Sequence, residues 1–344
     1  MRCTLLISDL LPPPSPDGGP CQDLRLDALE TMFARGNLVL QPPCERDAWL
    51  CREFGVAKQR DWPVAALTLA GDGVDPERYY WLRADPVELR TDRNRLVLAG
   101  GVSDLDANET HDLIAALNRH FARDGIVFLA PFPQRWYLRV DRAPGIVTTP
   151  LARAANRDID RHLPQGDDAL DWHRVINEAQ MVLHAHAVNA AREARGAAAV
   201  NSVWLWGGGT MPAAVKPALA AAWSDDILTR SLAAAAETAH HGLPDSAAAW
   251  LCAAPAAGDH HLLVFVRLSN ALHAGDVPAW REQLALLERD WMAPLLSALR
   301  TGKISAITLV ASNSANLLEV TLTPSQLWRL WRRAQPLASH AGAA

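Results

Sequence analysis

The feature that most constrains the fold is the alternation of strands and helices along the last third of the chain. Apolar runs typical of strands cover residues 262–268, 304–311 and 317–322, and a helical pattern of apolar residues covers 279–299. The chain also opens with a short buried strand, residues 5–7, followed by a loop and a helix. Strands that alternate with helices favour a mainly parallel sheet covered by helices on both faces. We therefore expect an α/β fold.

The length of the chain predicts more than one compact part. At 344 residues it exceeds the size at which a single hydrophobic core usually keeps growing. Residues 141–166 are rich in Pro, Arg and Asp and lack periodicity, so the predicted boundary lies there. We expect a discontinuous core of residues 1–87 and 166–335, a smaller inserted α+β domain of residues 88–165, and a disordered tail at 336–344.

The composition argues against several classes of protein. Hydrophobic residues make up 49% of the chain and charged residues 21%, which excludes a mostly disordered chain. A formal net charge of −5 argues against the broadly basic surface of a nucleic-acid binder. No apolar run is long enough to span a bilayer, and five cysteines without C-x-x-C spacing are typical of reduced thiols. We expect a soluble cytoplasmic protein with neither nucleic-acid nor membrane partners.

A strand followed by three glycines is the most distinctive local motif. The apolar run 200–206 leads directly into Gly207, Gly208 and Gly209. Glycines after a buried strand let the backbone approach a ligand, and their N–H groups can cradle an anion if a helix starts beyond Pro212. The same pattern fits a tight turn packed beneath the tryptophans of the run equally well.

The helix predicted before this motif, residues 171–195, carries a dense set of polar side chains: Asn177, Glu178, His184, His186, Asn189 and Arg192. His186 falls on the apolar face, where a histidine is more often a hydrogen-bonded core residue than a ligand. Asn189 and Arg192 lie near the end of the helix, where a phosphate or carboxylate could be bound bidentately. A solvated helix end explains them equally well.

Another histidine occupies a position where α/β proteins place their sites. His273 and Asp276 follow the carboxyl end of a predicted parallel strand. This makes His273 the better histidine candidate for chemistry. The sequence contains no G-x-S-x-G elbow, no P-loop and no H-E-x-x-H motif.

The central block resembles a block of the archaeal-type cofactor-independent phosphoglycerate mutases. That block reads N-E, L-x-x-H-P-V-N, R, G, A-N and then a strand ending in a glycine turn, and its counterparts here run from Asn177-Glu178 to Gly209. Weaker likenesses cover residues 26–36, 67–80 and 270–276, the last resembling a D-x-x-x-H-x-x-D motif. The overall pattern is also similar to bacterial regulatory proteins of the RpfE type. The resemblance implies an alkaline-phosphatase-like fold.

The departures from the resembled family concern its metal ligands and its nucleophile. Those enzymes hold two divalent metals with an early Asp, a nucleophilic Ser, the Asp and His of the D-x-x-x-H motif, and a late Asp-His pair with a further His. The corresponding positions here are Ser8 or Asp9, the serine-free segment 60–63, Ser269 with His273, and Ser312-Asn313. Two hard cations each need several anionic or imidazole ligands, and phosphoryl transfer needs an activated nucleophile. The resemblance therefore implies a degenerate enzyme.

Three functions are compatible with this pattern. The first is a regulatory protein that binds a small phosphorylated or carboxylated ligand, or a protein partner, without turnover and without a cofactor. In this reading, the ligand is held by the backbone N–H groups of the three glycines and by the charge of Arg192. Side-chain hydrogen bonds orient it, from Asn177, Asn189 and Asn201.

The second is an active metal-dependent phosphoglycerate mutase or phosphatase. It would need Mn²⁺ or Mg²⁺ and a rearranged site of Asp9, Asp61 and His273, with Asp61 and His273 in catalysis and Asp9 and His273 on the metal. The third is a scaffold whose partner surface carries Trp328 and Trp331 on a tail helix, although tryptophans at that spacing more often pack into their own core.

Overall fold

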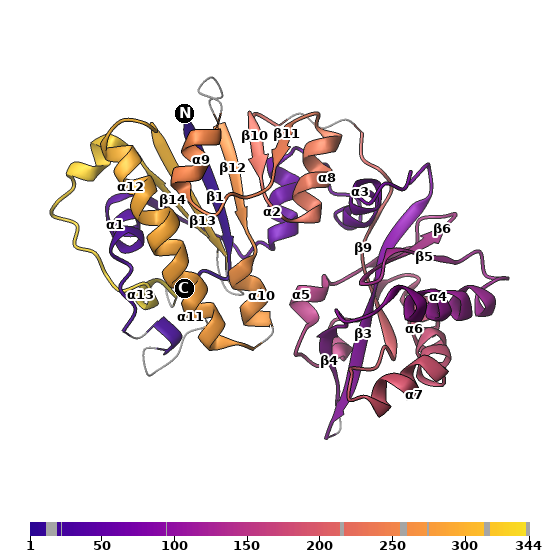
Figure 1. Ribbon diagram of the computed structural model, residues 1–344. Coiled ribbons are helices and arrows are strands. Elements are labelled where there is room, and N and C mark those ends of the chain that lie inside the picture. Colours follow the sequence, from indigo (N-terminus) through magenta and orange to yellow (C-terminus); the bar gives the residue numbers. More distant parts are fainter. Residues whose placement is uncertain are drawn as a thin grey trace. The chain divides into compact units, whose positions relative to one another are not determined.

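The chain folds into two compact units, each described here by itself (Figure 1). The computed structural model describes residues 1–11, 19–21, 23–93, 95–213, 217–254, 260–273, 275–312 and 317–341. The parallel-sheet unit comprises Met1–Gly55 and Val215–Ala344, and the inserted unit comprises Val56–Ala214.

A seven-stranded sheet forms the centre of the parallel-sheet unit. Its order is β11 (Ala239–His241), β10 (Ala221–Trp223), β12 (His260–Phe265), β1 (Arg2–Ser8), β13 (Ala306–Ser312), β14 (Leu317–Leu322) and β2 (Asn37–Gln41). The strands from β11 to β13 pair in parallel, whereas β14 and β2 add antiparallel partners at one edge. Figure 1 shows the indigo β1 beside the orange strands, so the two ends of the sequence meet in one sheet.

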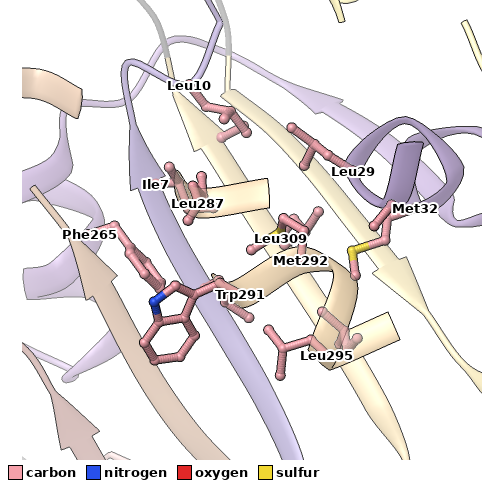
Figure 2. Packing of buried hydrophobic residues seen from close by; sticks show 14 of the residues in the cluster. Ile7, Leu10, Leu29, Met32, Phe265, Leu287, Trp291, Met292, Leu295 and Leu309 are labelled. Atoms are coloured by element: carbon pink, nitrogen blue, oxygen red, sulfur yellow. The ribbon is translucent and has the colours of Figure 1, made fainter. Parts of the chain in front are cut away.

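Strand β1 lies at the middle of this sheet because nearly all of it is apolar. Every residue of β1 after Arg2 is buried, as expected of a strand covered on both faces. Alternate residues Leu5 and Ile7 belong to a core cluster with residues of the helices on one face, and Leu6 points to the other face. Figure 2 shows Ile7 and Leu309 of the sheet packed near Leu287 and Met292.

Several helices cover the sheet. They are α1 (Asp27–Arg35), α2 (Arg46–Glu53), α8 (Ile227–Ala235), α9 (Ala247–Ala253), α10 (Arg267–His273), α11 (Val277–Leu287) and α12 (Ala293–Arg300). The helix predicted over 279–299 is present as α11 and α12, joined without a break by a π-helical turn, Glu288–Met292.

The end of the chain differs from the prediction. The predicted tail helix is absent: a 3-10 turn, η4 (Pro324–Trp328), ends before Trp331. Of the predicted disordered tail, residues 336–341 are ordered, since Leu337 is buried and α13 (Ala338–Ala341) follows it. Leu337 packs into the core and holds this segment in place. The local composition gave no sign of this contact.

The inserted unit is α+β. Its five-stranded sheet pairs β4 (Arg95–Gly101), β3 (Tyr80–Asp92), β6 (Arg135–Val140) and β5 (Val127–Phe132) in that order, with β9 (Ser202–Gly209) also paired to β3. All these pairings are antiparallel. The core contains apolar residues of α4 (Ala107–His120) and α6 (Ala169–His184), and α3 (Val64–Gly71) contributes to a smaller cluster.

The remaining elements of the inserted unit are short. They are β7 (Ile146–Val147), α5 (Leu151–Ala154), η2 (Ile159–Arg161), β8 (Gln165–Gly166) and α7 (Ala187–Ala194). The single helix predicted over 171–195 is therefore two helices, α6 and α7. His186 separates them in an extended conformation, and its Nδ1 accepts a hydrogen bond from the amide of Val188 at 3.3 Å as the cap of α7.

The predicted domain limits do not coincide with these units. Residues 56–87 and 166–214, expected in the core, belong to the inserted unit. The reason is a long-range pairing: β9 runs antiparallel to β3, with Asp85 opposite Trp204. Strands on both sides of the aperiodic stretch therefore share one sheet. Within the described residues, no helix combines the length and the apolar character needed to cross a membrane.

Candidate functional site

The three glycines form the end of a strand, so the predicted glycine loop was wrong. Gly207, Gly208 and Gly209 are buried in β9, and the described residues that follow lead into β10. A Cβ at Gly208 would lie 2.5 Å from the hydroxyl of Tyr80, and one at Gly209 would lie 2.5 Å from Pro63. Glycine is required here by close packing within the protein.

The amides of Gly207 and Gly208 already have acceptors. Gly207 donates to the hydroxyl of Thr148 at 3.1 Å, and Gly208 donates to the carboxylate of Asp61. Neither amide is left to cradle an anion.

Arg192 is an internal structural residue. Its side chain has no exposed surface; Nε donates to the carbonyl of Ala198 at 2.7 Å and Nη1 to Glu109 at 2.7 Å. The remaining nitrogen donates to Asp104. Burial acts to raise the pKa of Glu109, but the hydrogen bond from Arg195 and the charge of Arg192 outweigh it and lower that pKa. Arg192 ties α7 to the start of α4, and its predicted contact with a ligand is replaced by these ion pairs.

Two asparagines of the central block, Asn189 and Asn201, form hydrogen bonds with the backbone and do not present a binding surface. Asn189 donates to the carbonyls of Leu183 and Val200 at 2.7 and 2.8 Å and accepts from the amide of Val200 at 2.8 Å. Asn201 makes a matching pair of bonds with the backbone of Leu89, at 2.7 and 2.8 Å. Asn177 is exposed on α6. The block that carries the family resemblance is thus a structural joint between α6, α7 and β9.

An arginine-lined cavity of about 740 Å³ lies elsewhere in the inserted unit. Its lining residues come from β4, the segment after β7, α5, η2 and β8: Arg95, Val147, Thr148, Thr149, Arg153, Arg157, Asp158, Arg161, His162, Leu163 and Gln165. Four guanidinium groups therefore surround this space, with Asp158 as the single carboxylate of the lining. Burial lowers the pKa of His162, and the charges of Arg157 and Arg153 lower it further. The cavity is strongly cationic.

All residues of this cavity except Arg95 lie in the stretch assigned to a domain boundary, and they were missed for that reason. Arg153, Arg157 and Arg161 recur every four residues, which was the available signal. No regular helix carries this spacing: α5 ends at Ala154, and Asn156 adopts a positive φ of 58° before η2 begins. The three arginines are therefore spread over two short helical turns and the irregular backbone between them, and no continuous helical pattern links them.

Asp61, a predicted catalytic residue, is an anchor for one wall of the cavity. Its buried carboxylate accepts from the amide of Thr148 at 3.1 Å and from the Thr148 hydroxyl at 2.5 Å. Burial raises the pKa of Asp61 against the effect of these bonds. Asp61 thus fixes Thr148, which lines the cavity and also accepts from Gly207.

The carboxyl edge of the parallel sheet carries the other predicted residues. Asp9 follows β1 with a positive φ of 56°, its amide donates to the carbonyl of Ser312 at 2.9 Å, and its carboxylate accepts from the hydroxyl of Ser269 at 2.7 Å. Asp9, Ser269 and Ser312 therefore meet at this edge. His273 is the last residue of α10, and its side chain lies outside the described residues, as does Asn313.

Two solved structures have this fold over nearly the whole chain. A cofactor-independent phosphoglycerate mutase from Thermoplasma acidophilum gives a TM-score of 0.52 at 17% identity, over 100% of this chain and 95% of that one. The PH0037 protein from Pyrococcus horikoshii gives a TM-score of 0.58 at 14% identity, over 99% and 92%. The chain has the fold of a cofactor-independent phosphoglycerate mutase. The predicted alkaline-phosphatase-like α/β class is confirmed.

Curated mutases are also similar to the chain in sequence, over part of their length. The 2,3-bisphosphoglycerate-independent phosphoglycerate mutase of Methanosarcina mazei is 27% identical over 159 residues, 41% of this chain and 40% of that protein. The Methanothrix thermoacetophila enzyme is 29% identical over 167 residues, 43% and 41%. A probable mutase of Geobacter sulfurreducens is 31% identical over 136 residues, 38% and 33%. The chain thus matches between a third and about two fifths of each relative's length. No family model matches it.

The described side chains at this sheet edge do not fit a two-metal centre. Across the described residues, no group of three or more His, Cys, Asp or Glu side chains could hold a metal ion. Hydroxyls, at Ser269 and Ser312, stand where the resembled mutases have carboxylates, and a hydroxyl brings no charge to offset the lost hydration of a hard cation.

A guanidinium also stands among the carboxylates near this edge. Arg46 donates from Nε to Asp47 at 2.9 Å, and its Nη2 lies 3.4 Å from a carboxylate oxygen of Asp226. Burial acts to lower the pKa of Arg46, but the charges of Asp226, Asp47 and Asp9 outweigh it and raise that pKa. Arg46 therefore offsets part of the negative charge of these three carboxylates.

Proposed function

We propose that this chain is a phosphoglycerate-mutase-like protein that binds a small phosphorylated or carboxylated ligand and does not transform it. The observation that carries the proposal is the cavity with four arginines and one carboxylate in its lining. Guanidinium groups bind phosphate and carboxylate oxygens with charge-assisted, often bidentate hydrogen bonds. A volume of about 740 Å³ suits a small metabolite.

The absence of turnover is supported by the donor set of the parallel-sheet unit. Phosphoryl transfer in the resembled mutases relies on metal ions for charge stabilisation, and Ser269, Ser312 and the Arg46 ion pairs supply no metal centre. We propose that ligand binding serves regulation, in line with the resemblance to RpfE-type proteins. We place it in the cytoplasm because all five cysteines, each among the described residues, are free thiols.

Calorimetric titration with 3-phosphoglycerate and with inorganic phosphate tests the proposal. The double variant Arg153→Gln/Arg157→Gln is expected to bind roughly 100- to 10,000-fold more weakly than wild type, since each of the two charge-assisted bonds contributes about 1.5–3 kcal/mol. Arg174→Gln, which changes an exposed arginine of α6, is the matched control and is expected to bind like wild type. Equal affinities for wild type and the double variant would refute the cavity as the site.

An active metal-dependent phosphoglycerate mutase or phosphatase is the second candidate. The observation in its favour is the name of the curated relatives, 2,3-bisphosphoglycerate-independent phosphoglycerate mutase. It would draw on Asp9, Asp61 and His273 with Mn²⁺ or Mg²⁺. Conversion of 3- to 2-phosphoglycerate and phosphate release, each measured with and without Mn²⁺, decide between the two. Metal-dependent turnover that is lost in His273→Ala favours the enzyme.

A further inference from the structure

Strand β2 ends the seven-stranded sheet with an uncovered apolar edge. It pairs with β14 on one side, and in the described part of the chain no strand pairs with its other side. Leu38, Val39 and Leu40 are 42%, 52% and 47% exposed. Edge strands that remain unpaired are usually protected by charged residues, prolines or bulges. The five residues of β2, Asn-Leu-Val-Leu-Gln, contain neither charge nor proline, and their pairing with β14 has a continuous register.

A second apolar surface adjoins this edge. Trp328 and Trp331 are each 76% exposed and Leu330 is 64% exposed, so the prediction that such tryptophans pack into their own core was wrong. Arg329 ties this segment to the start of β2, because its Nη1 donates to the side chain of Asn37 at 2.7 Å. Arg332 donates to the carbonyl of Gly36 at 3.0 Å.

The combined surface is large enough for a specific interface. Two tryptophans at this exposure present on the order of 300 Å² of apolar surface. The four aliphatic side chains and the strand edge extend it toward the roughly 600–800 Å² that each partner buries in a specific complex. Such a patch on a monomer marks an interaction site.

The three central residues of β2, Leu-Val-Leu, read the same in both directions, and a side-chain amide lies at each end. We propose that two copies of the chain join edge to edge through β2, antiparallel and centred on Val39. This register places Leu38 opposite Leu40 of the second copy, and the amide side chain of Asn37 opposite that of Gln41. Leu40 and Leu38 share their sheet face with Leu318 and Val320, their partners on β14, so a row of apolar residues continues across the joined strands.

The charges beside the strand are complementary in the same register. Arg329 is bound to Asn37 at one end of β2, and Glu319 accepts from Nε2 of Gln41 at the other end, at 2.9 Å. The two-fold relation brings Arg329 of one copy to the end that carries Glu319 of the other. The same patch serves both partners, as a closed two-fold dimer requires.

Sedimentation velocity on the full chain tests the proposal. Wild type is expected to sediment as a dimer, with twice the 37.5 kDa mass of one chain. Val39→Lys and Val39→Asp each place like charges opposite one another and are expected to raise the dissociation constant roughly 100-fold or more. Mixed in equal amounts, the two variants are expected to form dimers again, because opposite charges now face across the two-fold axis.

Control variants separate this interface from general effects. Leu170→Lys changes an apolar residue that is 81% exposed in the inserted unit and is expected to leave the dimer intact. Trp331→Glu is expected to weaken the dimer. If melting curves show that either Val39 variant fails to fold, this variant tests the interface in its place. A monomeric wild type, or a dimer unaffected by these variants, overturns the proposal. Variants that stay monomeric when mixed overturn the register centred on Val39.

Discussion

The carboxylate of Asp61 accepts two hydrogen bonds from Thr148, one from its amide at 3.1 Å and one from its hydroxyl at 2.5 Å. The acceptor comes from the start of the inserted unit and the donor from the wall of the arginine-lined cavity, 87 residues further along the chain. The Thr148 hydroxyl in turn accepts from the amide of Gly207. A chain of hydrogen bonds thus links the glycine end of β9 to the cavity.

Thr148→Val removes this hydroxyl and is expected to lower the free energy of unfolding by about 1–3 kcal/mol at neutral pH. The hydrogen bond from the Thr148 hydroxyl favours the charged form of Asp61 and so lowers its pKa. Its loss therefore adds to the increase in the pKa of Asp61 that burial causes. The substitution lowers the free energy of unfolding by its full amount while the carboxylate of Asp61 is charged. This loss shrinks as the pH falls through the raised pKa and the carboxyl takes up a proton. Urea unfolding from neutral to acidic pH measures it; Thr149→Val is the control, with an expected cost below about 0.5 kcal/mol.

Arg192 and Arg195 offer a matched pair, because both donate to the carboxylate of Glu109. Arg192 has no exposed side-chain surface, whereas that of Arg195 is 50% exposed. Arg192→Met removes the buried guanidinium that pairs with both Glu109 and Asp104 and is expected to cost about 3 kcal/mol or more. Arg195→Met is expected to cost less than about 1 kcal/mol because solvent screens the exposed pair. Similar losses in chemical denaturation for both variants would contradict the structural assignment of Arg192.

The parts of the fold that the sequence predicted are those set by local patterns. The predicted strand at 317–322 is β14, and the strand predicted over 304–311 is shifted by one or two residues in β13. Long apolar runs suffice for this, since a strand buried on both faces needs them. The limits of the inserted unit could not be predicted in this way, because β3 and β9 pair across more than a hundred intervening residues.

The candidate site was harder to predict, for a related reason. Arg192 carries the polar signature of a ligand-binding residue, but its carboxylate partners precede it by 83 and 88 residues. Whether an arginine faces a carboxylate or a ligand depends on such distant contacts. The cavity arginines show the converse: their spacing was visible, yet only the folded backbone around Asn156 brings Arg153, Arg157 and Arg161 to one cavity.

Gly208→Ala tests whether the glycines are a packing requirement. The new Cβ would lie 2.5 Å from the Tyr80 hydroxyl and 2.9 Å from Leu82, so the neighbours must move, at an expected cost of about 1–3 kcal/mol in unfolding free energy. Gly101→Ala is the control, because its nearest contact would be an ordinary 3.5 Å. Thermal melts compare the two. A Gly208→Ala variant with wild-type stability and weakened anion binding would instead restore the glycine cradle.

His162 is expected to make the proposed anion binding dependent on pH. Burial and the charges of Arg157 and Arg153 hold the pKa of His162 below its ordinary value of 6.5 in the free cavity. A bound anion offsets the positive charge of the arginines and raises that pKa, so binding takes up a proton. Affinity is therefore expected to increase as the pH falls through the pKa of His162 in the bound state, by up to about tenfold for each unit by which the anion raises that pKa.

Sulfate is a suitable probe for this effect because its own charge does not change in this range of pH. Calorimetric titrations at several pH values should show the increase in wild type and in His111→Gln, a variant of an exposed histidine on α4. His162→Gln is expected to bind sulfate with an affinity that no longer changes with pH. If this variant kept the wild-type pH dependence, the proton would belong to another group, and His162 would have no part in recognising the anion.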